Sequence, residues 1–270
     1  MNRQKVILIT GASSGFGKAF AQKFASKGYK VFGTSRNADY TEKNGVVMIP
    51  MNVTDNSSIE HAIAFIKSEA GFLDILVNNA GYGISGSVED TTIEEAKALF
   101  DTNFFGAHRV CRAAIPIMRD QNSGHIINIG SLGGVISIPF QAFYSATKSA
   151  FASLSDGLSM ELQPYGIKVT RIEPGDYATG FTAARIMVKE SGSQSVYNER
   201  CKKAISIMEH DEENGADCKQ LAEKVLKIAE TNKPRLVYRE GMFIQKSLVS
   251  ILNYLPNRLV QKILMDTYVV

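Results

Sequence analysis

Short apolar runs alternate with helix-like segments along almost the whole chain, and this alternation restricts the fold more than any other feature. Seven runs have the character of strands, at residues 6–9, 30–34, 46–51, 75–78, 125–129, 167–172 and 235–238. Several are nearly continuous in β-branched and other apolar residues, as expected of strands buried on both faces of a parallel sheet. Because strand and helix alternate repeatedly, we predict an α/β fold with right-handed βαβ units and a doubly wound parallel sheet.

The segments between the strands have helical periodicity. Phe16, Phe20 and Phe24 fall at four-residue steps, which gives one apolar stripe along a helix. Neither an internal repeat nor a linker rich in Pro, Gly and Ser marks a second domain. We therefore predict a single domain over residues 1–240, followed by an amphipathic helical extension over residues 241–270 that packs on the same domain.

Charge and composition exclude several classes of function. A net charge of +3 over 270 residues is too small and too evenly spread to indicate nucleic-acid binding. No apolar run reaches the ~18 residues of a membrane span, and the N-terminus leads into the first strand without a secretory apolar region, so we predict a cytoplasmic protein. The three cysteines and four histidines show no metal-binding spacing, and we predict no metal site.

A glycine-rich turn follows the first strand and opens the first helix. Gly11, Gly15 and Gly17 have the spacing G-x-x-x-G-x-G, which allows a tight turn and a close approach of the backbone to a ligand. The N–H groups and dipole of a helix N-terminus would then face an anion. The alternative is a plain tight turn, but the strand–turn–helix context favours a dinucleotide pyrophosphate.

The end of the second strand predicts which dinucleotide binds. In dinucleotide folds an acidic residue at this position binds the free ribose 2′-hydroxyl, whereas an arginine accommodates a 2′-phosphate. Here the residue is Arg36, and the next acid is Asp39. We therefore expect NADP rather than NAD, against the alternative of an arginine merely solvated at a strand end.

Three residues later in the chain supply the parts of an acid/base centre. Tyr144 and Lys148 are four apart, so they share one face of a helix, and an ammonium near a phenol favours the phenolate. Ser131 follows the strand-like run 125–129 and offers a hydroxyl donor. Such a set can move a proton on or off a carbonyl oxygen. Taken alone, Tyr-x-x-x-Lys is more typical of a solvated helix face.

Together these motifs resemble the short-chain dehydrogenase/reductase family. The match includes Thr10-Gly11-x-x-x-Gly15-x-Gly17, Asn78-Asn79-Ala80-Gly81, Asn103, Ser131, Tyr144-x-x-x-Lys148 and Pro174-Gly175-x-x-x-Thr179, in the family's order and spacing over residues 5–240. The resemblance implies a Rossmann-like domain with about seven parallel strands. It also implies NAD(P)-dependent interconversion of alcohols and ketones.

The resemblance assigns roles to individual positions. Tyr144 would be the general acid/base, Ser131 would position the substrate oxygen, and Lys148 would bind the nicotinamide ribose and lower the Tyr144 pKa. Asn103 would hold a water that extends the proton relay, although by itself it is more typical of a satisfied buried amide than of a catalytic group. The implied cofactor-binding residues are Gly11, Ser13, Ser14, Gly15, Gly17, Arg36, Asn52, Val53, Asn79, Ala80, Gly81, Tyr144, Lys148, Pro174, Gly175 and Thr179.

Two positions depart from the family pattern. Asn52 stands where an aspartate usually lies beside the adenine, but an amide still donates and accepts hydrogen bonds. Phe16 lies between two of the glycines, where Ile or Leu is usual, and only its bulk matters there. We expect cofactor binding to survive both.

The substrate is harder to predict. Residues 176–215 carry few strand signals and suit a substrate-covering region, while residues 241–264 have the pattern of two amphipathic helices hinged at Pro256. Such tails resemble those of the family's hydroxysteroid, retinol and long-chain ketone branch, and could close a pocket, form a subunit contact or rest on a membrane surface. We expect an NADP(H)-dependent oxidoreductase of a sterol, retinoid or long-chain keto-lipid, assembled as a homodimer or homotetramer. The alternatives are a reductase of small ketones or aldehydes and a non-catalytic NADP(H)-sensing regulator.

Overall fold

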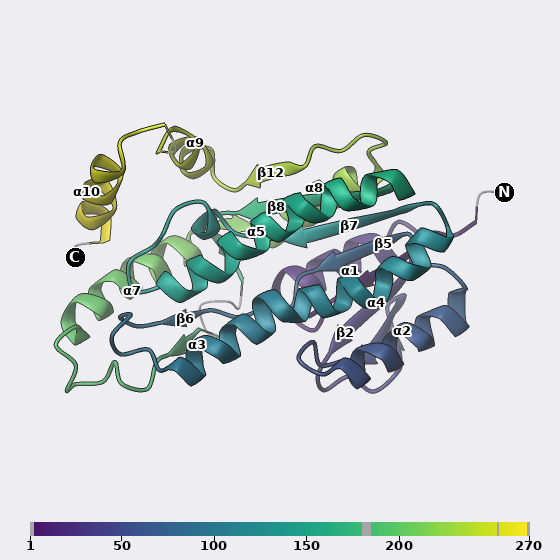
Figure 1. The fold of residues 1–270 in the computed structure, drawn as a ribbon, viewed down its shortest axis with the longest axis horizontal. Coiled ribbons are helices and arrows are strands. Elements are labelled where there is room, and N and C mark those ends of the chain that lie inside the picture. Colours follow the sequence, from purple (N-terminus) through teal and green to yellow (C-terminus); the bar gives the residue numbers. More distant parts are fainter. Residues whose placement is uncertain (1–2, 180–184, 253, 269–270) are drawn as a thin grey trace.

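The computed structural model describes residues 3–179, 185–252 and 254–268, and its centre is an eight-stranded sheet (Figure 1). The strand order is β12-β8-β7-β5-β1-β2-β4-β3, and every pair is parallel except β3 with β4. The strands are β1 (Val6–Ile9), β2 (Lys30–Ser35), β3 (Thr41–Lys43), β4 (Val46–Pro50), β5 (Ile75–Asn78), β7 (Gly124–Ile129), β8 (Ile167–Pro174) and β12 (Val237–Glu240). All seven predicted strands are therefore present in a doubly wound sheet. The eighth strand, β3, is a short exposed edge that the apolar pattern did not predict.

Helices cover both faces of this sheet, and alternate residues of each strand face opposite sides. Val6 and Leu8 pack in one apolar cluster with α2 and α4, whereas Ile7 and Ile9 pack in the other with α1 and α8. Both clusters contain fully buried side chains, which explains the continuous apolar runs of the inner strands. The main helices are α1 (Gly15–Ala25), α2 (Asn56–Ala70), α3 (Ile93–Phe100), α4 (Ala107–Asp120), α5 (Ala142–Leu162), α7 (Asn198–Glu213) and α8 (Cys218–Glu230).

Local sequence determines where these helices begin and end. The side chain of Asp55 caps α2 by accepting from the Ser57 N–H at 2.9 Å, and Gly71 ends that helix in the left-handed conformation. Thr92 and Glu95 form a reciprocal capping box at the start of α3. In the predicted α1 stripe, Phe20 and Phe24 are fully buried.

Shorter elements complete the chain between the main strands and helices. A π-helix (Asp101–Gly106) joins α3 to α4, and 3₁₀ turns span Leu132–Gly134 and Gln163–Tyr165. Residues 176–215 form more structure than the sequence pattern indicated, since they contain the 16-residue helix α7. Four two-residue strands pair away from the main sheet: β6 (Ile84–Ser85) with β10 (Ile186–Met187), and β9 (Tyr177–Ala178) with β11 (Ala216–Asp217).

Two helices follow the last strand of the sheet. Helices α9 (Phe243–Leu252) and α10 (Asn257–Tyr268) lie on either side of Pro256, beyond β12 at the edge of the molecule (Figure 1). Gln245 of α9 bonds to Asp176, which directly follows β8, and α10 packs against α7. None of the described helices is both long and apolar enough to cross a membrane.

Because the inner strands are parallel, their carboxyl ends meet at one edge of the sheet. The turns after β1, β2, β5, β7 and β8 all leave the sheet there. Ligands of open α/β sheets bind in the crevice outside these strand ends. The glycine turn, the amides after β5, Ser131 and Pro174-Gly175 all follow strands that end at this edge.

Candidate active site

Helix α5 places Tyr144 and Lys148 one turn apart, and both side chains are buried. The Lys148 ammonium donates to the carbonyl oxygen of Ile129 at 3.0 Å, which ties α5 to the carboxyl end of β7. The Lys148 nitrogen lies 5.8 Å from the centre of the Tyr144 ring. The pair is therefore a fixed part of the interior rather than a solvated helix face.

Ser131 is placed next to Tyr144 by the turn that follows β7. It caps the 3₁₀ turn, and its hydroxyl oxygen accepts from the Gly133 N–H at 3.0 Å. The same side chain forms a hydrogen bond with Tyr144. This turn packs closely on α5, because a Cβ atom at Gly134 would stand 2.8 Å from the carbonyl carbon of Lys148. Two hydroxyls and an ammonium thus converge at the sheet edge.

Burial shifts the pKa values of both members of the Tyr144–Lys148 pair. Burial raises the pKa of Tyr144 to about 12, and the hydrogen bond with Ser131 opposes the rise. Burial also lowers the pKa of Lys148 to about 8. Desolvation is thus the largest influence on the pKa of Tyr144, and the role of Lys148 in keeping Tyr144 acidic stays a prediction. Tyr144 is a protonated phenol at neutral pH, ready to donate its proton.

Asn103 lies in the π-helix, an element that often occurs at functional sites. Its side-chain oxygen accepts from the Tyr82 N–H at 3.0 Å, and its nitrogen donates to the Tyr82 carbonyl at 2.8 Å and to the Thr147 hydroxyl at 3.4 Å. The amide is thus satisfied by the protein. A Cβ atom at Gly81 would come within 2.9 Å of its oxygen and 4.0 Å of the Lys148 nitrogen, so Asn103 and Lys148 border the same space. Its part in a water relay stays a prediction.

The glycine turn has the geometry of a phosphate cradle. Gly11 and Gly15 have positive φ angles of 66° and 50°, and a Cβ atom at Gly17 would lie 2.2 Å from the Gly11 carbonyl oxygen. Within the described chain, the Ser14 side chain forms no capping hydrogen bond at α1, unlike Asp55 at α2. The first N–H groups of α1 are therefore left for a ligand, which fits the pyrophosphate of a dinucleotide.

The segment after β8 faces this cradle. Pro174 is buried at the strand end, and the Gly175 N–H donates to the Glu240 carbonyl at 2.8 Å. Thr179 lies opposite the glycine turn, because a Cβ atom at Gly15 would stand 3.9 Å from the Thr179 Cβ. The structure thus brings these predicted cofactor residues to the same crevice as the first turn.

Arg36 and Asn52, which are predicted to meet the adenosine, follow β2 and β4 at the carboxyl edge of the sheet. Arg36 directly follows β2, is exposed, and forms no ion pair within the described residues. The Asn52 oxygen accepts from the N–H and the hydroxyl of Thr54 at 3.2 and 3.0 Å, so only its NH₂ group is left to meet an adenine. Val53 is buried. Ser13 and Ser14 are both exposed beside the glycine turn.

The amides after β5 brace the glycine turn. Asn79 donates to the carbonyl oxygens of Thr10 at 2.9 Å and Gly11 at 3.2 Å, and the Ala80 N–H donates to the Thr10 hydroxyl at 2.9 Å. Asn78 is buried inside the sheet and donates to Asn128 at 2.9 Å. These bonds hold the ends of β1 and β5 together, and contact of Asn79 and Ala80 with a cofactor stays a prediction.

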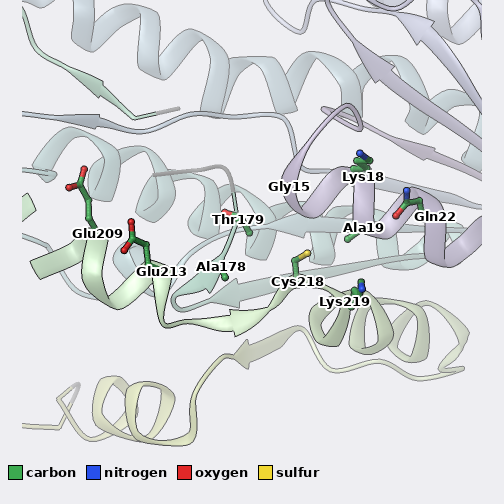
Figure 2. A pocket seen from close by; sticks show the side chains of 10 residues that line it. All are labelled: Gly15, Lys18, Ala19, Gln22, Ala178, Thr179, Glu209, Glu213, Cys218 and Lys219. Atoms are coloured by element: carbon green, nitrogen blue, oxygen red, sulfur yellow. The ribbon is translucent and has the colours of Figure 1, made fainter. Parts of the chain in front are cut away.

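An open cleft of about 760 Å³ continues from the cradle between α1 and the helices α7 and α8 (Figure 2). Thr179 lies between the two sides in Figure 2. Ser131, Tyr144 and Lys148 are not among the residues that line it, so the cleft borders the phosphate side of the crevice. The lining residues are Gly15, Lys18, Ala19, Gln22, Ala178, Thr179, Glu209, Glu213, Cys218 and Lys219.

Four charged or polar residues near Tyr144 were not predicted. Asp176, Arg185 and Glu212 are all close enough to shift the pKa of Tyr144, and Gln245 bonds to Asp176. They come from four segments that are far apart in the chain. The only signal in the sequence is that Asp176 directly follows Pro174-Gly175. Phe181, which the sequence places in the same region, lies outside the described residues.

Comparison with known proteins decides the family. The family model described as short chain dehydrogenase matches residues 5–189. The chain belongs to the short-chain dehydrogenase family. It is 40% identical over 267 residues, 98% of each chain, to 3-ketodihydrosphingosine reductase of Bacteroides thetaiotaomicron.

Solved structures of other short-chain dehydrogenases share the fold. One from Streptomyces avermitilis is 33% identical with a TM-score of 0.83, covering 97% of this chain and 96% of that one. One from Burkholderia phymatum in complex with NAD is 25% identical with a TM-score of 0.74, covering 87% and 88%. A closed form of serine dehydrogenase complexed with NADP+ is 26% identical with a TM-score of 0.75, covering 88% and 95%. This short-chain dehydrogenase is an oxidoreductase acting on CH–OH groups, with a fold that binds nicotinamide cofactors.

Proposed function

We propose that this protein is an NADPH-dependent reductase that converts a long-chain keto-lipid into the corresponding secondary alcohol. The observation that carries the proposal is the buried Tyr144 phenol, hydrogen-bonded to Ser131 beside Lys148 and next to the glycine cradle. A bound nicotinamide supplies the hydride that reduces the carbonyl carbon. Side chains of the protein would donate the proton, position the substrate oxygen and hold the nicotinamide ribose.

Tyr144 donates its proton to the substrate oxygen as the carbonyl is reduced, and Ser131 positions that oxygen. General acid help of this kind contributes typically ~10²–10⁴-fold. A phenol with a pKa of about 12 stays protonated through the neutral range, which suits reduction better than oxidation. Lys148, fixed by the Ile129 carbonyl, would hold the ribose hydroxyls, and Asn103 would support a proton path past it. Ser131 follows β7, and Lys148 is bonded to the last residue of β7, so these side chains stay together at the carboxyl edge of the sheet.

Arg36 supports NADPH as the cofactor. Its exposed guanidinium follows β2, where the adenosine ribose of a dinucleotide lies, and none of the described acidic residues pairs with it. A planar guanidinium suits bidentate contacts with a 2′-phosphate. Since neighbouring structures carry NAD or NADP+, the preference of this chain rests on Arg36 itself.

The substrate class rests on the relative and on the surroundings of Tyr144. Similarity to a 3-ketodihydrosphingosine reductase extends over nearly the entire chain, tail included. Tyr144 packs in an apolar cluster with Ile84, Leu99 and Val188. Ile186 and Met187, on the strand β10 that directly precedes Val188, are about half exposed and suit an alkyl chain.

The two tail helices and the assembly belong to the same proposal. Ile251, Leu259 and Met265 are exposed apolar residues on α9 and α10, and Tyr254 between the helices is 91% exposed. A peripheral contact of this face with a lipid bilayer would bring the enzyme to a lipid substrate. We also propose a homodimer or homotetramer in the cytoplasm, which light scattering and fractionation test directly.

The test is consumption of cofactor with a panel of ketones graded by chain length. We expect NADPH to be consumed faster than NADH, with kcat/KM rising as the alkyl chain is lengthened. A preference for short ketones would point to a small-carbonyl reductase. Tight NADPH binding without turnover of any ketone would overturn catalysis and favour an NADP(H)-sensing regulator.

A further inference from the structure

Three charged side chains from separate segments lie within electrostatic range of Tyr144. Asp176 follows β8, Arg185 precedes β10, and Glu212 lies in the last turn of α7. Arg185 pairs with Glu212 through its Nη2 atom, and all three are near enough to shift the pKa of Tyr144. Gln245 reaches Asp176 from α9. Glu209, the other ion-pair partner of Arg185, also lines the cleft that borders Gly15.

Arg185 is buried with unused hydrogen-bonding capacity. Only 2% of its side chain is exposed, yet within the described chain its Nε and Nη1 atoms have no hydrogen-bond partner. The Nη1 atom stands 3.7 Å from Glu209, which balances charge but is beyond a hydrogen bond. Buried donors without partners are costly, so they are expected to meet a ligand acceptor. Because the carboxylates of Glu209 and Glu212 already balance the charge of Arg185, the ligand acceptor can be a neutral oxygen.

Asp176 shows that the rest of the cluster carries a surplus of negative charge. Gln245 accepts from its N–H at 3.2 Å and donates to its carboxylate, so the side chain is held in place. Burial, followed by the nearby carboxylates of Glu212 and Asp211, raises the pKa of Asp176 to about 6, against the opposing effects of the Gln245 hydrogen bond and of Arg185. Tyr268, at the end of α10, lies near the same carboxylates. A cation would relieve this repulsion, and an anion would increase it.

We propose that Asp176, Arg185 and Glu212 form a subsite for the polar head of the substrate, a ketone with a protonated amine and a hydroxyl on the carbons next to the carbonyl. The ammonium pairs with Asp176, and the hydroxyl oxygen accepts from the free donors of Arg185. The alkyl chain leaves past Ile186 and Met187, which directly follow Arg185. This assignment rests on the proposed function, since it requires that Tyr144 acts on a ketone.

The test compares three ketones of equal chain length with NADPH at pH 7. One is a 2-amino-1-hydroxy-3-ketone, the second lacks the amine, and the third lacks the hydroxyl. We expect kcat/KM to be about 10- to 100-fold higher for the full head group than for either analogue, the range of a charge-assisted hydrogen bond. Titration calorimetry with the saturated 2-amino-1,3-diol gives a second readout that needs no turnover.

Matched variants separate the two contacts. Asp176→Asn keeps the bond to Gln245 but removes the charge, and should abolish the advantage of the amine while leaving that of the hydroxyl. Arg185→Lys keeps a cation beside Glu212 but removes the free donors, and should abolish the advantage of the hydroxyl. Glu199→Gln, an exposed charge change at the other end of α7, should alter neither ratio.

The outcomes distinguish this inference from the proposed function. Equal rates with all three ketones, unchanged by Asp176→Asn, would overturn the subsite while leaving the reductase in place. Absence of turnover with every ketone would overturn the reductase itself. If both variants lose activity with all three ketones equally, the cluster only supports the fold and the subsite assignment is wrong.

Discussion

The two ends of the active site differ in whether main-chain or side-chain atoms would contact the ligand. At the cofactor end the ligand would meet backbone, because glycines at 11, 15 and 17 bring main chain and helix N–H groups to the surface of the crevice. At the other end, beside Tyr144, it would meet charged side chains from β8, α7 and the segment before β10, held partly by α9. Backbone recognition needs a fixed spacing along the chain, whereas the side-chain cluster needs only proximity in space.

The same contrast extends to stability. Glycine spacing allows close packing at no electrostatic cost, while the cluster beside Tyr144 holds buried carboxylates that repel one another. Binding sites often retain such unfavourable groups because function requires them. Substitutions at the two ends should therefore have opposite effects on folding, even where both impair activity.

Tyr144 lies where the two ends meet, and its loss should have the largest effect on activity. Tyr144→Phe removes the proton donor but keeps the ring that packs on Leu99 and Val188. We expect kcat to fall by about 10²- to 10⁴-fold with little change in NADPH affinity, measured by steady-state kinetics and by fluorescence titration. Tyr165→Phe, the same change at a half-exposed position just after α5, should leave both kcat and NADPH affinity unchanged. Full activity of the Tyr144 variant would exclude it as the acid.

The cofactor end is tested by two glycine substitutions that differ only in surroundings. In Gly17→Ala the new Cβ would lie 2.2 Å from the Gly11 carbonyl oxygen, so the cradle must open, and we expect destabilisation of about 1–3 kcal/mol together with weaker NADPH binding. In Gly157→Ala, inside α5, no atom lies within 4 Å, and we expect stabilisation of up to about 1 kcal/mol. Urea unfolding measures both. Equal effects would show that close approach at Gly17 is unimportant.

Most of the fold could be predicted because it depends on local pattern. All seven predicted strands are present, although the last one begins two residues later than expected, at Val237. Strand β3 was missed because Thr41–Lys43 is polar and fully exposed, with no apolar periodicity. The glycine turn, Ser131 and the Tyr144–Lys148 pair could be proposed as site residues for the same reason, since each motif has a fixed spacing.

What could not be predicted depends on burial and on contacts between distant segments. Spacing placed Lys148 beside Tyr144 but could not show that desolvation would raise the pKa of the phenol. The motif that includes Asn79 gave no sign that its side-chain amide braces the Thr10 and Gly11 carbonyls. Arg185 gave no signal at all, because its significance comes from Glu212 and from the donors that burial leaves unpaired.

Arg36 provides a test of the outer part of the cofactor end, where recognition changes from backbone to side chain. Arg36→Ala should lower kcat/KM for NADPH by about 10- to 100-fold, because charge-assisted bonds to a phosphate are lost, and should leave NADH nearly unaffected. The measurement is the ratio of the two cofactors' kcat/KM values. Arg112→Ala, an exposed arginine on α4, is the control. An unchanged ratio would mean that Arg36 is only solvated.

Asp176→Asn should act in the opposite direction to Gly17→Ala and stabilise the fold. The pKa of Asp176 is raised from 3.8 to about 6, so the folded protein holds a proton that the unfolded chain releases, and Asp176 costs stability as pH rises through this window. A difference of roughly 2 between the folded and unfolded pKa values corresponds to at most about 3 kcal/mol of unfolding free energy.

The Asp176→Asn variant should gain about 2 kcal/mol of unfolding free energy at pH 8, and this gain should vanish near pH 4. His125, whose pKa burial lowers to about 4, also titrates here, but it is common to both proteins and cancels in the difference. Urea unfolding at pH 8, 6 and 4 measures the gain. A variant less stable than the parent at pH 8 would mean that Arg185 more than compensates the carboxylate, and the two ends would then not differ in their effect on folding.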